Sequence, residues 1–113
     1  MKYMLMFWVD ESAGVTEDED AAMMIAVKSW IEKMTERGVL LHGSPLCPVK
    51  DGKIVSVRGG EVLVTDGPFA ETKEQVAGLN VLACPSLADA AEIASQHPTA
   101  RIGTVEVRQF ALG

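Results

Sequence analysis

The sequence of 113 residues has no apolar run long enough to cross a membrane and no cluster of Lys and Arg. A membrane-spanning helix needs about 18 or more consecutive apolar residues. The apolar run at residues 1–9 is short, and it meets Asp10 and Glu11 where an export signal would need small residues for cleavage. Nucleic acids and anionic lipids both require clustered positive charge. We therefore expect a cytoplasmic protein that binds neither nucleic acid nor membranes.

The chain also lacks the common signatures of nucleotide binding and of serine-type acyl transfer. It contains no G-x-G-x-x-G, no P-loop and no G-x-S-x-G. Its histidines and cysteines, His42, His97, Cys47 and Cys84, do not occur at the paired spacing of metal ligands. We therefore predict no metal and no cofactor. Because cysteines in a chain without an export signal are usually reduced, both are expected to be free, buried thiols.

Negative charge is concentrated near the start of the chain. The formal net charge is −6, and ten of the 16 acidic residues balance the ten basic ones. The other six have no Lys or Arg among them: Asp10, Glu11, Glu17, Asp18, Glu19 and Asp20. An acidic surface of this kind can attract a basic protein partner. The length suits a single domain, residues 1–113.

The first third of the chain predicts a strand followed by a helix. Residues 1–9 alternate between two apolar sets, Tyr3, Leu5, Phe7 and Val9 against Met4, Met6 and Trp8. Thr16 and Glu19 then form a capping-box pattern, and Gly38 ends the helical pattern. Apolar residues recur between them at helical spacing: Met23, Val27, Trp30, Ile31 and Met34. We interpret that stripe as core packing.

The middle of the chain predicts a strand over residues 39–46 and then two hairpin turns. Asp51-Gly52 is the first turn signal, and Gly59-Gly60 is the second, which would place Arg58 opposite Glu61. Residues 75–83 predict a further strand, in which Gly78 marks the close approach of a neighbouring backbone or a ligand.

The last third predicts a second helix and a final strand. Ser86 is the expected N-cap, with Asp89 three residues later, and His97-Pro98 closes the helix. The expected apolar stripe is Leu87, Ala90, Ala91 and Ala94. Residues 103–110 then alternate as a strand.

The order of these elements is β-α-β, an inserted β-hairpin region, and β-α-β. It favours an α+β fold of ferredoxin-like type, with an antiparallel sheet and both helices on one face. The first strand and the strand at residues 75–83 are apolar on both faces. Two helices cover only one face, so we predict a homodimer in which a second copy covers the other.

A rigid turn is predicted where residues 62–72 run from a strand into a charged segment. The Asp66 side chain can accept hydrogen bonds from the amides that follow, Gly67 can adopt a positive φ, and Pro68 fixes the next φ. Phe69 would anchor the loop in a pocket or a partner subunit.

The segment Thr65-Asp66-Gly67-Pro68-Phe69-Ala70-Glu71-Thr72-Lys73-Glu74-Gln75, followed by Gly78, resembles the signature of the DGPF-domain branch of the YCII-related family. The resemblance extends through residues 2–5, 58–60 and 103–108. It implies a dimeric α+β barrel. It also implies a catalytic pair, a histidine of the first helix and an aspartate near the end of the second. These positions fall near Val27 and near His97, so the pair is absent.

Two hypotheses about function follow. The first is a small-molecule-binding protein, an enzyme of proton-transfer or isomerase type, with a pocket between the sheet and the Asp66 loop. Its candidate catalytic residues are Asp66, His97 and His42, and its candidate ligand-binding residues are Gly67, Pro68, Phe69 and Glu71. The alternative is a non-catalytic dimeric protein-interaction module linked to sigma-factor regulation, because some family members are associated with extracytoplasmic-function sigma factors.

Overall fold

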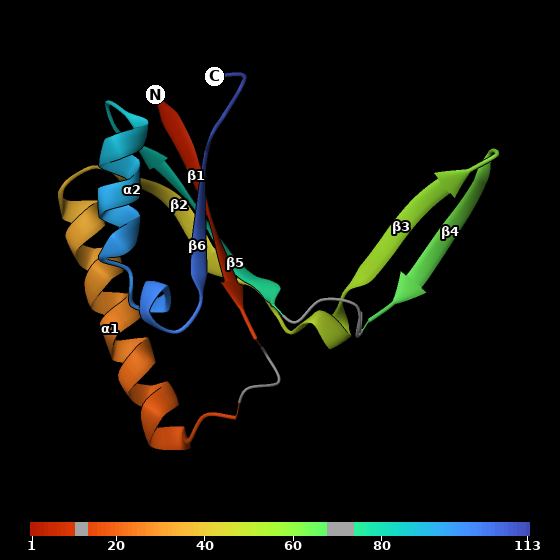
Figure 1. The fold of residues 1–113 in the computed structure, drawn as a ribbon, viewed down its shortest axis with the longest axis horizontal. Coiled ribbons are helices and arrows are strands. Elements are labelled where there is room, and N and C mark those ends of the chain that lie inside the picture. Colours follow the sequence, from red (N-terminus) through yellow and green to blue (C-terminus); the bar gives the residue numbers. More distant parts are fainter. Residues whose placement is uncertain (11–13, 68–73) are drawn as a thin grey trace.

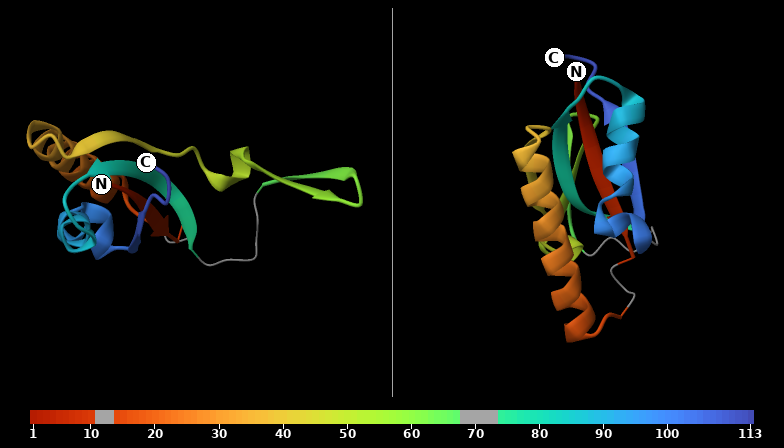
Figure 2. Two further views of the ribbon diagram at one scale, coloured as in Figure 1. Left: turned by 90° about the horizontal axis from the view of Figure 1, so that it is seen from above. Right: turned by 90° about the vertical axis from the view of Figure 1, so that its left-hand side faces the viewer.

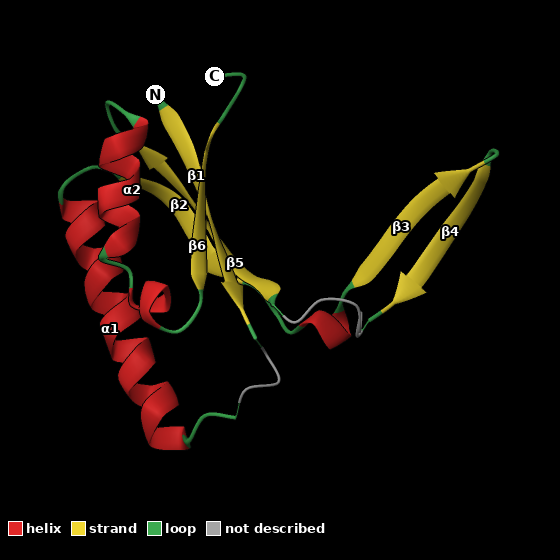
Figure 3. Cartoon of the chain, viewed as in Figure 1, coloured by secondary structure: helices red, strands yellow, loops and turns green. Residues whose placement is uncertain are grey.

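The computed structural model describes residues 1–10, 14–67 and 74–113. The chain contains six described strands and two α-helices (Figures 1 and 3). The strands are β1 (Lys2–Val9), β2 (Leu40–Pro45), β3 (Lys53–Arg58), β4 (Glu61–Asp66), β5 (Gln75–Ala83) and β6 (Thr104–Gln109). The helices are α1 (Glu17–Glu36) and α2 (Leu87–Ser95), with two short 3-10 turns, η1 (Val49–Asp51) and η2 (Pro98–Arg101).

Four strands form the main sheet in the order β2-β5-β1-β6, and each neighbouring pair is antiparallel. β3 and β4 form a separate two-stranded sheet. Both helices lie against one face of the main sheet (Figure 2). The predicted α+β class is confirmed, and this arrangement is consistent with the predicted ferredoxin-like fold. In the described part of the chain, no helix combines the length and apolar character that a membrane crossing requires.

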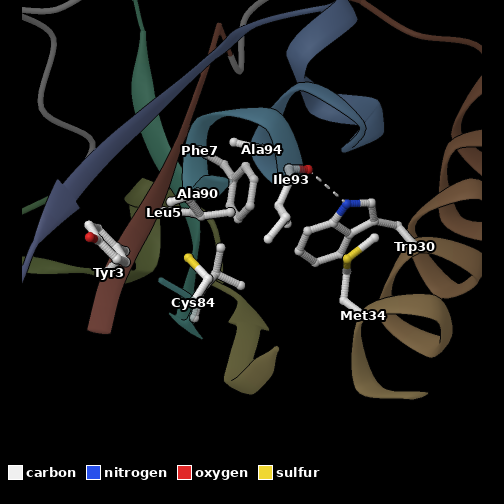
Figure 4. Packing of buried hydrophobic residues seen from close by; sticks show 10 residues of the cluster. Tyr3, Leu5, Phe7, Trp30, Met34, Cys84, Ala90, Ile93 and Ala94 are labelled. Atoms are coloured by element: carbon white, nitrogen blue, oxygen red, sulfur yellow. Dashed lines mark hydrogen bonds between the residues drawn. The ribbon is translucent and has the colours of Figure 1, made fainter. Parts of the chain in front are cut away.

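The core lies between this face and the helices (Figure 4). Tyr3, Leu5 and Phe7 of β1 are buried there, as the alternation in the sequence predicts. α1 contributes Trp30 and Met34, and the Trp30 indole N–H donates to the carbonyl oxygen of Ile93 on α2 at 3.3 Å. The remaining buried core side chains are Leu82, Cys84, Ala90, Ile93 and Ala94.

The helix ends follow the sequence signals. The Thr16 side chain accepts from the Glu19 N–H and completes the predicted capping box, and Gly38 follows the last turn with a φ of 71°. Ser86 caps α2 by accepting from the Asp89 N–H. The stripe predicted for α2 is partly wrong, because Leu87 and Ala91 are exposed and Ile93 lies in the core instead.

One of the two predicted hairpin turns forms. Gly59 and Gly60 both adopt positive φ, at 59° and 79°, and they connect β3 to β4 with Arg58 opposite Glu61. The turn expected at Asp51-Gly52 is wrong, since η1 ends there and the chain passes directly into β3.

The second face of the main sheet has no cover within the described chain, and we call it the open face. Its register places Met4 opposite Val81 and Met6 opposite Leu79. Trp8 lies on the same face of β1. These side chains are half-buried although no helix lies over them. The open face is therefore apolar at its centre, as the alternation of β1 predicts.

Candidate functional site

One cavity lined by the described residues is a groove of about 970 Å³. It lies among the first half of α1, the end of β1, η2, and the segment between β2 and β3. Most of its lining is apolar: Ala22, Met23 and Ala26 of α1, Leu46 after β2, Pro98 of η2 and Ile102 after it. We call this cavity the α1–η2 groove.

Charged side chains of both signs line the same groove. Asp10 at the end of β1 and Glu19 and Asp20 in the first turn of α1 supply carboxylates. Lys50 of η1 and Arg101 of η2 supply cations. An apolar lining with a few charged groups is the usual composition of a small-molecule site. The groove can therefore accommodate the apolar part of a ligand while its charged groups orient the polar part.

His97 lies beside the groove but inside the core. Its ring centroid is 4.2 Å from that of Phe7 and 4.7 Å from that of Trp30, in an edge-to-face arrangement with the latter. Its Nδ1 accepts from the Thr99 N–H at 3.1 Å and so caps η2. Burial lowers the pKa of His97 to about 4. The ring is therefore neutral at pH 7 and packed among aromatic side chains.

The other two candidate catalytic residues lie elsewhere in the molecule. His42 is exposed on β2, opposite Val81, and therefore lies on the open face, whereas His97 lies on the helix-covered face. Asp66 ends β4 and forms an exposed ion pair with Lys53 of β3. Within one chain, the structure does not bring these three side chains together.

The predicted ligand-binding loop is described only at its first residue. Pro68, Phe69 and Glu71 lie outside the described residues. The expected positive φ of Gly67 is wrong, because the described glycines with positive φ are Gly38, Gly59, Gly60 and Gly113. A Cβ atom at Gly67 would instead overlap the carbonyl oxygen of Val49. Glycine is required here by the close approach of η1.

Gly78 behaves as its position in the strand predicts. A Cβ atom there would lie 3.2 Å from the carbonyl oxygen of Ser44 and 3.3 Å from the Cα of Pro45. The neighbour that approaches is therefore the backbone of β2.

Both cysteines are free, as predicted. Cys84 is buried, and burial raises the pKa of its thiol, which makes it a weak nucleophile. Cys47 is exposed, so the expectation that both are buried is wrong for this residue. Among the described residues, no group of three His, Cys, Asp or Glu side chains could hold a metal ion.

Sequence reasoning did not identify the groove. The sequence singles out Asp10, Glu19 and Asp20 only as members of the acidic cluster, with Glu19 also in the capping box, and Lys50 and Arg101 carry no local signal. A polar network at the edge of the open face was missed as well. There the Trp8 indole N–H donates to Glu106 at 3.2 Å, and Glu106 pairs with Arg108 at 2.7 Å. These contacts depend on the pairing of β1 with β6, which no short motif encodes.

Comparison with known proteins gives a family and no activity. Residues 1–111 match the YCII-related domain. An uncharacterized protein of Rhizobium meliloti (strain 1021) is 34% identical over 116 residues, covering 99% of this chain and 94% of that protein. The match spans the strands and helices that line the groove as well as the main sheet. The chain belongs to the YCII-related family.

Proposed function

We propose that the protein binds a small amphipathic molecule in the α1–η2 groove. The observation that carries this proposal is the groove itself, whose volume of about 970 Å³ is at the upper end of the range for small-molecule sites, roughly 300–1,000 Å³. Its apolar lining and its charges of both signs favour a ligand with an apolar body and at least one ionised group.

Proton transfer is the chemistry that this groove supports best, so we retain an enzyme of proton-transfer or isomerase type as the finer proposal. Asp10, Glu19 and Asp20 supply carboxylates that can move a proton, and Arg101 or Lys50 can stabilise an anion formed in the reaction. Because His97 is buried and is not among the residues that line the groove, while its Nδ1 already accepts a hydrogen bond, the carboxylates are better supported than this imidazole as the base. The catalytic roles predicted for Asp66, His42 and His97 stay predictions.

A thermal-shift screen of a metabolite library tests the binding proposal. Ala22 lines the groove and its neighbour Ala21 does not, so Ala22→Phe and Ala21→Phe place the same side chain inside and outside the site. We expect compounds that stabilise the wild type to bind Ala21→Phe normally. Ala22→Phe should bind them at least about tenfold more weakly, the equivalent of about 1.4 kcal/mol. A library without a stabilising compound, or equal affinities for the two variants, would contradict the proposal.

We further propose that the open face is covered by a second copy, forming the dimeric α+β barrel that the DGPF resemblance implies. The chain exposes 7,863 Å². A compact monomer of this mass exposes roughly 6,000 Å², so about 1,800 Å² per chain is in excess. Two such surfaces fall within the range of about 2,000–5,000 Å² buried by obligate homodimers. Size-exclusion chromatography with light scattering should give twice the chain mass, and the chain mass itself would contradict this proposal.

A second candidate function is a protein-interaction module linked to sigma-factor regulation. The observation that favours it is the exposed acidic first turn of α1, residues 17–20. A purified extracytoplasmic-function sigma factor from the same organism is the probe. Binding that weakens with salt, is lost when these four residues become amides and survives Ala22→Phe would support this candidate. Absence of binding at low salt would reject it.

The free thiols of Cys47 and Cys84 support a reducing compartment, and on that basis we infer a cytoplasmic location.

A further inference from the structure

The β3–β4 hairpin projects from the body of the molecule. Its two strands pair only with each other among the described strands. In Figure 1 the hairpin extends far from the main sheet. The radius of gyration is 15.9 Å, whereas a compact chain of this length has one of about 13 Å. An isolated two-stranded hairpin is at best marginally stable in water. The hairpin therefore needs a surface to lie against.

One face of the hairpin is a continuous valine surface. The register pairs Val55 with Val64 and Val57 with Val62, and cross-strand partners share a face. These four side chains are 55–63% exposed. The other face is mixed, with Ile54 and Leu63 beside Ser56, Thr65, Arg58 and Glu61. We call the four-valine side the valine face.

The direction of the hairpin identifies its partner. When the molecule is viewed from the helix side, the helices lie in front, the main sheet lies behind them, and the hairpin lies behind the sheet (Figure 2). The hairpin therefore projects on the side of the open face. Any protein seated on that face lies next to the hairpin, and a second copy related by two-fold symmetry would receive one hairpin while offering its own.

We propose that each hairpin is an arm whose valine face packs against a second copy of this chain seated on the open face. The inference rests on the dimer proposed above and adds that the arm is part of the interface. The excess exposed area agrees with this, because the open face and the valine face are both apolar and neither is covered by another described element. Burying the valines on the partner also supplies the packing that the hairpin lacks alone.

A pair of matched double variants tests the arm. Val55→Thr with Val64→Thr makes the valine face polar, and Ile54→Thr with Leu63→Thr makes the same kind of change on the opposite face. All four substitutions keep residues that favour strands. The dimer dissociation constant is measured by sedimentation at several concentrations. The valine-face variant should raise it by about 30-fold, and the control should stay within about threefold.

Hydrogen exchange of the hairpin amides gives a second readout that does not depend on the variants. In the wild type, amides of residues 54–65 should be protected in the dimer and lose protection on dilution to monomer. Equal effects of the two double variants, or unprotected hairpin amides in an intact dimer, would contradict the proposed role of the arm but not the dimer itself. A wild type that is monomeric at high micromolar concentration would overturn both.

Discussion

The two faces of β1 carry similar apolar side chains but meet different surroundings. Tyr3, Leu5 and Phe7 are buried under α1 and α2, whereas Met4, Met6 and Trp8 on the open face are only half-buried. Apolar surface on either side of a sheet needs cover. The sequence therefore makes both faces of the sheet apolar, whereas its two helices cover only one of them.

The largest effect is expected on the covered face. Leu5 is fully buried, so Leu5→Ala should lower the free energy of unfolding by about 2–5 kcal/mol through lost burial and the cavity left behind. Urea unfolding followed by circular dichroism measures this change. Met6→Ala is the comparison on the open face. Its effect should depend on protein concentration, because the surface lost there belongs to the proposed dimer. A concentration-independent loss of the same size for both variants would remove the distinction between the faces.

Lowering the pH should destabilise the protein through His97, which is buried on the helix-covered face. Its pKa is about 4 when folded against about 6.5 when unfolded, so the unfolded chain binds the proton more readily. This group therefore leaves the free energy of unfolding unchanged above pH 6.5. As the pH falls from 6.5 toward 4, it lowers the free energy of unfolding by about 3 kcal/mol in total. His97→Asn keeps an acceptor for the Thr99 N–H and removes the titration. Thermal unfolding between pH 7 and 4 should show a smaller acid loss in this variant than in the wild type, and an identical loss would argue against a neutral, buried imidazole.

A smaller effect is expected where η1 meets the start of the loop. Because a Cβ atom at Gly67 would overlap the carbonyl oxygen of Val49, Gly67→Ala should destabilise the protein by about 1–3 kcal/mol. Among the described residues, no atom lies within 4 Å of the equivalent position at Gly14, and Gly14 is not one of the glycines with positive φ. Gly14→Ala is therefore the control, expected within about 0.5 kcal/mol of the wild type. Equal melting temperatures for the two variants would mean that η1 does not lie against Gly67.

The smallest effect is expected at the base of the hairpin. Lys53 and Asp66 form an ion pair between exposed side chains, and pairs of this kind contribute about 0–1 kcal/mol. Asp66→Asn should change the melting temperature little, and high salt should remove what difference remains. A large loss of stability would show that Asp66 makes stabilising contacts beyond its exposed ion pair with Lys53.

Local signals predicted the element ends well because each one acts over a few residues. The capping box at Thr16, the N-cap at Ser86 and the paired glycines at Gly59-Gly60 all form as predicted. The prediction for Gly67 was wrong because its conformation depends on a residue far away in the sequence. Its neighbour is η1, which is remote in sequence and replaces the expected hairpin at Asp51-Gly52, so the constraint is a tertiary contact rather than a turn conformation.

The candidate site could be predicted only in part, since it is assembled from segments far apart in the chain. Asp10, Lys50 and Arg101 meet in one groove because η2 and the segment after β2 both approach α1. His42 and His97 show that sequence also fails to tell which candidates lie apart. Both are histidines and equally plausible bases by residue type, yet they lie on opposite faces of the sheet. The side on which a strand residue lies follows from register, which the hydrophobic pattern fixes for β1 but not for the polar β2.

Sedimentation tests most directly whether a second copy covers the open face. The wild type should sediment as a dimer at low micromolar concentration, and Met6→Glu, which places a charge at the centre of the open face, should sediment as a folded monomer. Leu87→Glu is the control, since Leu87 is exposed on α2, outside the proposed interface. This variant should remain a dimer. A monodisperse wild-type monomer, or a Met6→Glu variant that dimerises as tightly as the wild type, would contradict the account.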